Sequence, residues 1–167
     1  MDAYDESTYG DKIAEVYDDW YASRLDPKDT VDLLAELASE GRTLELGIGT
    51  GRVALPLAAR GVDGVGIDSS QAMVDRLRAK PGGDEIEVTI GNFADVDVEG
   101  TFSLIYAAFV TFFQLTSQEE QIRCMRNVAA HLQPQGWFVF DAFVPDVARY
   151  RNNQMVLVED VGTDHVL

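Results

Sequence analysis

The feature that most constrains the fold is a glycine-rich turn between a short apolar run and a helical pattern. Its sequence is Leu44-Glu-Leu-Gly-Ile-Gly-Thr-Gly-Arg52, with glycines at 47, 49 and 51. Glycine permits positive φ and a close backbone approach, so N–H groups of the turn and of the helix N-terminus can face an anionic ligand group. A dinucleotide-binding turn spaces its last two glycines by two residues, but position 52 here is arginine.

An acidic residue follows the turn at the spacing of a ribose contact. Asp68 ends the next apolar run, 21 positions after Gly47. A carboxylate at the carboxyl end of a second strand can accept hydrogen bonds from both ribose hydroxyls at this distance. The turn and Asp68 together predict a nucleoside-binding site.

Apolar runs alternate with helical patterns through most of the chain. Each run is short and bounded by turn residues, so we expect strands over 43–46, 65–67, 86–90, 102–108 and 137–142. The 102–108 run is apolar almost throughout and predicts a strand buried on both faces. This alternation is typical of βα units, which predicts an α/β fold class with a Rossmann-like, doubly wound, mainly parallel sheet.

Three helices should connect these strands. The first follows the glycine turn and runs to Arg60, where Gly61 stops it. The second has Ser69 or Ser70 as its N-cap and carries Met73, Val74 and Leu77. The third begins with a capping box over 117–120 and ends before Pro134; its apolar positions are Ile122, Met125, Val128, Ala129 and Leu132.

Residues 1–42 predict an N-terminal helical cap. Two sets of apolar residues have helical spacing there: Ile13, Val16, Tyr17, Trp20 and Tyr21, and then Val31, Leu34, Leu37 and Ala38. Residues 43–143 form the core. Residues 144–167 begin a C-terminal substrate-side or strand region, in which 155–158 is a candidate strand, and the three parts make a single domain.

The charge of the chain restricts its partners. Thirteen basic residues face 29 acidic ones, for a formal net charge of -16. This charge repels phosphate backbones and anionic membrane surfaces, so neither nucleic acid nor a membrane is an expected partner. It suits a small cationic or amine-bearing substrate, although excess acidic residues more often serve solubility alone.

The remaining composition predicts a soluble, cytoplasmic protein without a metal. Cys124 is the single cysteine, so no internal disulfide can form, and no Cys/His cluster has the spacing of zinc ligands. The N-terminus is polar and acidic, unlike a signal peptide, and no apolar run approaches the length of a membrane span.

From about Tyr17 to Phe143, the sequence resembles class I S-adenosylmethionine-dependent methyltransferases. It is similar to the small-molecule group that includes sugar-amine N,N-dimethyltransferases. The resemblance rests on four segments: 45–51 (ELGIGTG), 66–73 (GIDSSQAM), 91–93 (GNF) and 131–136 (HLQPQG). It implies that S-adenosyl-L-methionine is the cofactor and that a methyl group passes to a nitrogen or oxygen of a small molecule, leaving S-adenosyl-L-homocysteine.

The resemblance also implies a role for each cofactor-binding residue. Gly47, Gly49 and Gly51 form the turn, with the first two against the methionine part of the cofactor. Glu45 faces the ammonium group, directly or through water. Asp68 binds the ribose, and Ser69 or Met73 borders the adenine. Phe93 and Asn92 hold the base from its other side; many relatives carry Asp at the Asn92 position, which makes Phe93 the firmer assignment.

Further positions are assigned around the reacting centre. Tyr17 is a candidate lid over the sulfonium, because aromatic faces attract cations, although aromatics at helical spacing are usually core. Phe109, Thr111 and Phe112 follow the fourth strand, where relatives place substrate contacts. Arg52 either meets the cofactor's carboxylate or faces solvent. No residue is assigned as a catalytic base.

Two other interpretations stay open. An NAD-dependent oxidoreductase shares the fold and is disfavoured by the glycine spacing and Arg52. A non-catalytic cofactor-binding or dimerising module is supported by length, because the fold ordinarily continues past the fifth strand with a helix and an antiparallel strand pair. Residues 144–167 are too short for both. Either the chain is a fragment, or a shortened domain leaves its sheet edge for a partner such as a second copy.

Overall fold

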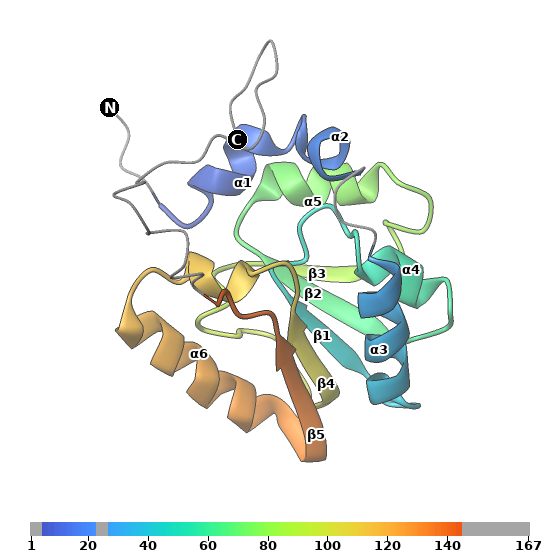
Figure 1. The fold of residues 1–167 in the computed structure, drawn as a ribbon, viewed down its shortest axis with the longest axis vertical. Helices are drawn as coiled ribbons and strands as arrows, with labels where there is room; N and C mark the ends of the chain where they lie inside the picture. The colour runs from blue at the N-terminus through green and yellow to red at the C-terminus, as the bar shows by residue number, and fades with distance from the viewer. Residues whose placement is uncertain (1–4, 23–26, 145–167) are drawn as a thin grey trace, which may run out of the picture.

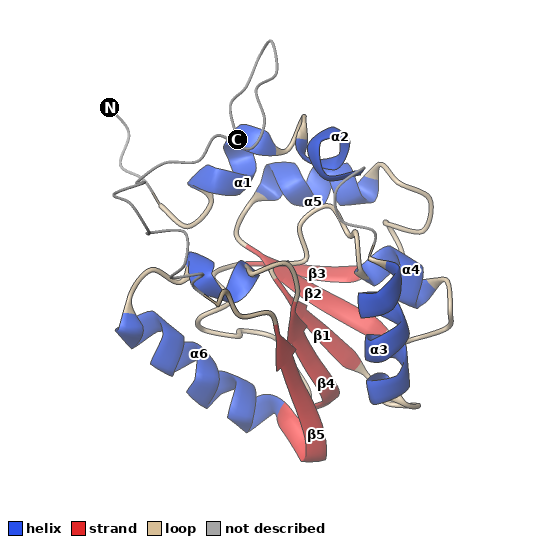
Figure 2. Ribbon diagram, in the orientation of Figure 1, coloured by secondary structure: helices blue, strands red, loops and turns tan. Residues whose placement is uncertain are grey.

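Five parallel strands form the centre of the molecule. The computed structural model describes residues 5–22 and 27–144. The strands run in the order β3-β2-β1-β4-β5 and every pairing is parallel. They are β1 (Thr43–Leu46), β2 (Gly64–Asp68), β3 (Glu87–Ile90), β4 (Phe102–Ala107) and β5 (Leu132–Phe140). The predicted α/β class with a parallel sheet is confirmed (Figure 2).

Helices cover both faces of this sheet. Helices α3 and α4 lie on one side and α6 on the other, while α1 and α2 lie beyond α5 at the end toward which the strands point (Figure 1). The helices are α1 (Thr8–Ile13), α2 (Tyr17–Ala22), α3 (Lys28–Ala38), α4 (Ala54–Ala58), α5 (Gln71–Arg78), α6 (Gln118–His131) and the 3-10 helix η1 (Thr111–Gln114).

Strand β4 is the centre of the hydrophobic core. Its Leu104 and Tyr106 pack with α3 and α4, whereas Ile105 and Ala107 belong to the cluster that includes α6. All four are buried, as the sequence predicted for this run. Full burial of a side chain such as Leu104 contributes about 1.5–3 kcal/mol, so the two clusters hold helices firmly against both faces.

The first predicted helical stretch is broken. The pattern from Ile13 to Tyr21 contains a turn over 14–16 that separates α1 from α2. The Arg76 guanidinium of α5 donates to the carbonyl oxygens of Ala14 and Glu15, at 3.2 and 2.5 Å. These carbonyls are therefore engaged by α5 instead of by the next helical turn, an interaction that side-chain periodicity does not reveal.

Strand β5 begins five residues earlier than predicted, at Leu132, and ends two residues earlier, at Phe140. Its ladder with β4 has an irregularity, because Phe102 pairs with Leu132 but Leu104 pairs with Trp137. The extra residues, 134–136, include a proline and Gln135 at φ 68°. Proline is tolerated because β5 is an edge strand.

The predicted apolar face of α6 was partly wrong. Ile122 and Met125 are 43% and 37% exposed, Ala129 is also exposed, and Leu132 lies in β5; the buried side chains of α6 are Val128, as predicted, and Cys124. Two polar contacts set this rotation: Arg123 Nε donates to Asp95 Oδ1 at 2.7 Å, and Asn127 Nδ2 donates to the carbonyl of Ala94 at 2.8 Å.

The N-caps of α5 and α6 are residues that the sequence predicted, although one helix boundary differs. Helix α4 ends at Ala58 instead of Arg60, but Gly61 closes the following turn at φ 81°. Ser70 is the N-cap of α5, and Ser117 forms the expected capping box with Glu120.

No helix in residues 5–22 and 27–144 is long and apolar enough to span a membrane. The candidate strand at 155–158 lies outside the described residues.

Candidate functional site

The glycine turn joins the carboxyl end of β1 to α4 and has the predicted backbone. Gly47, Gly49 and Gly51 have φ of 70°, 54° and 78°, a region that side chains disfavour. A Cβ on Gly47 would collide with Cγ2 of Thr111, and one on Gly51 would collide with the Leu77 side chain. The first close approach brings η1 against the turn, and the second packs α5 beneath it.

Asp68 locks the turn to the end of β2. The Gly49 N–H donates to its Oδ2 at 2.7 Å, and the Ser70 N–H donates to its Oδ1 at 2.8 Å. Burial raises the pKa of Asp68, and these backbone donors oppose that rise. An ionised carboxylate has about four lone-pair sites, so Asp68 keeps accepting capacity beyond its backbone contacts.

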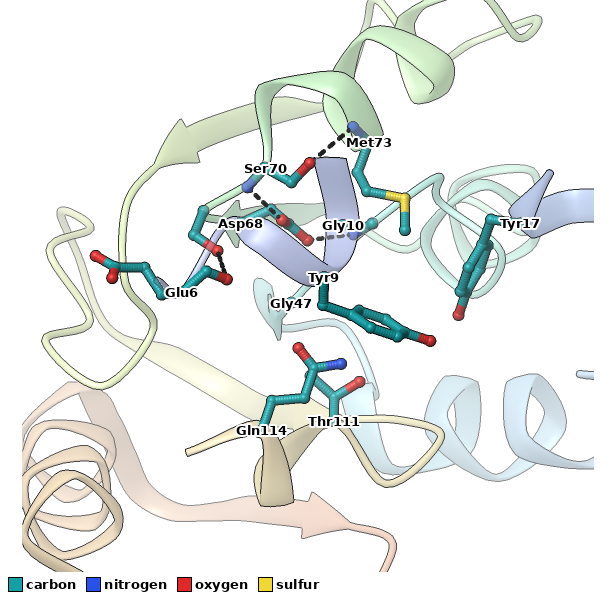
Figure 3. A pocket seen from close by; sticks show the side chains of 12 residues that line it. Glu6, Tyr9, Gly10, Tyr17, Gly47, Asp68, Ser70, Met73, Thr111 and Gln114 are labelled. Atoms are coloured by element: carbon teal, nitrogen blue, oxygen red, sulfur yellow. Dashed lines mark hydrogen bonds between the residues drawn. The ribbon is translucent and has the colours of Figure 1, made fainter. Parts of the chain in front are cut away.

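One hollow lies between this turn and the N-terminal helices. Figure 3 shows Asp68 and Ser70 on one side, Thr111 and Gln114 on the other, and the Tyr9 ring between them. Seven predicted site residues line it: Tyr17, Gly47, Gly49, Asp68, Ser69, Met73 and Thr111. Sequence reasoning missed the other five: Glu6, Tyr9, Gly10, Ser70 and Gln114.

Helix α1 is held directly against the start of α5. A Cβ on Gly10 would lie 2.5 Å from Ser70 Cβ, so only glycine allows this approach. Ser70 Oγ donates to Asp11 Oδ1 at 2.6 Å, and Ser69 Oγ donates to the Glu6 carbonyl at 2.8 Å. A glycine inside a polar helical segment was the one sequence signal that could have indicated this contact.

A second hollow adjoins the first and contains a buried acid. Glu45 lines it together with Tyr17, Arg52 and Phe109. The Glu45 side chain accepts a hydrogen bond from Tyr106 Oη at 3.1 Å. Burial raises the pKa of Glu45 to about 8, so at neutral pH this carboxyl mostly holds its proton.

Arg52 lies among aromatic rings. Its guanidinium carbon is 4.4 Å from the ring centroid of Phe109, 5.6 Å from that of Tyr21 and 5.9 Å from that of Tyr17. Of the two alternatives for Arg52, this position agrees with a side chain that lines the second hollow instead of facing open solvent. Burial raises the pKa of Tyr17 despite the opposing effect of Arg52.

Asn92 and Phe93 line a third hollow beside Ser69 and Gln114. The Asn92 Oδ1 atom accepts from the Ala94 N–H at 2.8 Å, so the amide N–H groups of Asn92 are not used in this contact. Phe93 is 7% exposed and belongs to the core as well as to this hollow. The two residues follow β3, which lies on the other side of β2 from β1 and its glycine turn.

The segment after β4 contains strained backbone. Phe109 and Val110 have φ of 59° and 65°, and the Phe109 N–H donates to Asp141 Oδ2 at 2.7 Å. Phe109 and Thr111 line hollows, as expected for this segment. Phe112 instead lies in the core, with its ring centroid 4.9 Å from that of Phe140. Its substrate role is not supported by this position.

The described residues hold no group of three or more side chains that could ligate a metal.

The comparison with protein families gives a specific match: a methyltransferase domain is recognised over residues 43–136. This segment contains the glycine turn, Asp68, Asn92 and the start of β5. The chain belongs to this methyltransferase family. The class resemblance expected from the four motifs is thus confirmed.

Several relatives of this methyltransferase are known. A cypemycin N-terminal methyltransferase from Streptomyces sp is 35% identical over 146 residues, which cover 84% of this chain and 58% of that protein. The CcbJ methyltransferase from Streptomyces caelestis is 46% identical, with a TM-score of 0.76 over 82% of this chain and 58% of that one. Streptomyces venezuelae DesVI is 25% identical, with a TM-score of 0.67 over 78% of this chain and 57% of that one.

Proposed function

We propose that residues 43–143 form the cofactor-binding core of a methyltransferase that moves a methyl group from S-adenosylmethionine to an amine nitrogen of a small molecule. The observation that carries the proposal is the contact between the turn that follows β1 and the carboxyl end of β2. Asp68 is tied to Gly49 by a hydrogen bond and stands beside Glu45, Tyr17 and Met73 around adjoining hollows. The chain spans about 58% of its relatives' length, so this is a proposal for the whole protein.

The residues present fit the chemical groups of this cofactor. Asp68 keeps accepting capacity for ribose hydroxyls after its two backbone contacts. Glu45, once ionised, would pair with the ammonium group, and Arg52 in the same hollow is a cation site for the carboxylate. Phe93 and Met73 offer apolar contacts to the adenine, and Asn92 offers an amide donor.

The reaction needs little acid–base chemistry from the protein. The bound sulfonium would supply an activated methyl group that is transferred by in-line displacement. The chain's own task is alignment, which can lower a barrier by about 7–11 kcal/mol. Thr111 and Phe109 hold the segment after β4 beside the glycine turn, where the acceptor would be oriented. The aromatic rings around Arg52 would help to exclude water.

An amine is the acceptor that the surface favours. Asp5, Glu6 and Glu120 line the hollow that contains Asn92, within a chain of net charge -16. This negative field would draw cationic amines toward the site, where the amine must lose its proton to solvent before it attacks the methyl group, and it would repel nucleic acid. The name of the cypemycin N-terminal methyltransferase, a relative, indicates a nitrogen acceptor.

The cellular setting is also a proposal. Cys124 is buried, and this burial raises the pKa of its thiol to about 11, which makes it an inert core residue. A single unreactive cysteine is consistent with a reducing cytoplasm. No contact among the described residues bears on a homodimer.

The test is calorimetric titration with S-adenosylhomocysteine, with NAD as a parallel control. We expect micromolar binding of the former and none of NAD. Binding of NAD alone would favour an oxidoreductase. Binding of neither would contradict the cofactor assignment. Once binding is established, amine and hydroxyl acceptors can be compared by product mass, where transfer only to hydroxyls would contradict the nitrogen assignment.

A further inference from the structure

Tyr106 and Glu45 form a buried pair on neighbouring strands. Tyr106 lies on β4 and pairs in register with Glu45 of β1. The Tyr106 hydroxyl donates to Glu45 Oε2 at 3.1 Å, and the two residues are 2% and 4% exposed. A hydroxyl placed at the centre of a core needs a partner, and here the partner is the acid that lines the second hollow.

The groups around Glu45 explain why this hydroxyl matters. Tyr106 faces it from β4, Asp68 from β2, Tyr17 from α2 and Arg52 from the segment before α4. Burial and the charge of Asp68 both favour the protonated form of Glu45. The Tyr106 hydroxyl is the strongest opposing contact, followed by the backbone N–H of Ala54.

We propose that Tyr106 is a positioning residue whose hydroxyl orients the Glu45 carboxyl toward the cofactor's ammonium group and favours its ionised form. This inference rests on the proposed function for the identity of the ligand. Tyr106 is not a catalytic residue, because it is buried in the core, lines none of the three hollows described above and acts only through Glu45. Burial beside Glu45 raises the pKa of Tyr106 well above its ordinary value, so the hydroxyl stays a neutral donor throughout.

The direction in which the pKa of Glu45 should change follows from the fact that Tyr106 donates the hydrogen bond. A hydrogen bond donated to a carboxylate favours the charged form, so its loss raises the pKa of Glu45 further. Binding of an ammonium group requires the ionised carboxylate, so the acid limb of the binding curve should move to higher pH. A hydrogen bond to a charged group corresponds to about a tenfold or larger change in affinity.

The experiment is Tyr106→Phe, which keeps the ring in the core and removes only the hydroxyl. S-adenosylhomocysteine affinity is measured by calorimetry from about pH 6 to about pH 9, where carboxyl ionisation controls binding. We expect binding about tenfold weaker at neutral pH and an acid limb displaced upward. An unchanged curve would overturn the proposal.

Two comparisons distinguish a specific effect of Tyr106 on Glu45 from a general disturbance of the core. Ser103→Ala removes another hydroxyl of β4, one bonded to the carbonyls of Ala38 and Arg42, and should leave the curve unchanged. In a Glu45→Gln background, Tyr106→Phe should change affinity by less than about twofold, because the group through which it acts is gone. A full effect in that background would mean that Tyr106 acts independently of Glu45.

A ligand-free measurement distinguishes this inference from the proposed function. The titration of Glu45 is followed by carbon NMR of labelled glutamate carboxyls in the apo chain, with Tyr106→Phe beside the original sequence. A higher pKa in the variant supports the hydrogen-bond role even if S-adenosylhomocysteine does not bind. If the original chain binds S-adenosylhomocysteine but the variant leaves the Glu45 pKa unchanged, only the inference fails.

Discussion

The half of the sheet that contains β1 and β2 differs in burial and in strand pairing from the half that ends at β5. At the β1–β2 side, Leu44, Leu46 and Ile67 are fully buried, and the loops beyond them are joined by Asp68. At the β5 side, Trp137 is 56% exposed, and Ile122 and Met125 of the adjoining helix are open to solvent. β5 also carries a break in its ladder, while the β1 pairings are continuous.

This difference indicates where a substitution should cost the most free energy of folding or binding. On the cofactor side, polar contacts are buried and each fixes a neighbouring loop, so losing one leaves a buried group without its partner. On the β5 side, solvent can replace the contacts that a substitution removes. The same type of substitution should therefore have a large effect on one side and a small effect on the other.

The strongest test compares two carboxylates that accept backbone N–H groups at strand ends. Asp68→Ala should weaken S-adenosylhomocysteine binding by about 2–4 kcal/mol, roughly 30- to 1000-fold, because paired ribose contacts are lost. Asp141→Ala, on the exposed β5 side, should weaken it less than Asp68→Ala, because Asp141 contacts the site only through the Phe109 N–H. Calorimetry measures both. Equal losses would mean that the two sides are coupled and the comparison is wrong.

Glu45 provides the second test because its effects on stability and binding should oppose each other. Its pKa is about 8 when folded against an ordinary 4.5, so the folded state holds a proton that the unfolded chain releases. Rising pH between these values therefore destabilises the fold, by up to about 1.4 kcal/mol per unit. Glu45→Gln should raise the free energy of unfolding at neutral pH by about 2–3 kcal/mol and weaken ligand binding.

Urea unfolding from about pH 5 to about pH 8 measures this difference between variant and original chain. The gain should grow with pH across that window and be smallest at its acid end. A constant difference would indicate repacking instead of ionisation. A variant that is less stable at neutral pH would contradict the burial of an ionisable Glu45.

Glycines at positive φ allow a third comparison. Gly47 and Gly61 have φ of 70° and 81°, but a Cβ on Gly47 would collide with Thr111, whereas one on Gly61 meets nothing within 4 Å. Gly61→Ala should cost about 1 kcal/mol from backbone strain, and Gly47→Ala about 2 kcal/mol. Thr111→Ser removes the colliding methyl and should recover part of the Gly47→Ala loss. Equal costs in urea unfolding would contradict the close approach of η1.

The sequence predicted what depends on local chemistry. The glycine turn, the Ser70 cap, the capping box at Ser117 and the five strands follow from residue types at fixed offsets, and each is present. The bulge in β5 was not predictable, because it depends on the register that β4 imposes. The break between α1 and α2 depends on Arg76, which is distant in sequence.

The same distinction applies to the site. The motif residues Gly47, Gly49 and Asp68 lie around one hollow as the spacing predicted. Tyr106 could not be identified, because a tyrosine in an apolar strand is indistinguishable from other core aromatics until Glu45 is placed beside it. Gly10 and Tyr9 were missed because their segment meets the site only through tertiary packing.

The smallest expected effect lies on α6, where the predicted face was partly wrong. Ile122 is 43% exposed and Val128 is 2% exposed, although both were assigned to the buried face. Val128→Ala should cost about 1–2 kcal/mol in urea unfolding, because it leaves a cavity. Ile122→Ala should stay within about 0.5 kcal/mol of zero, because alanine's higher helix propensity offsets the small lost contact. If Ile122→Ala instead costs as much as Val128→Ala, then Ile122 is covered in solution, and the β5 side is not the open half of the molecule.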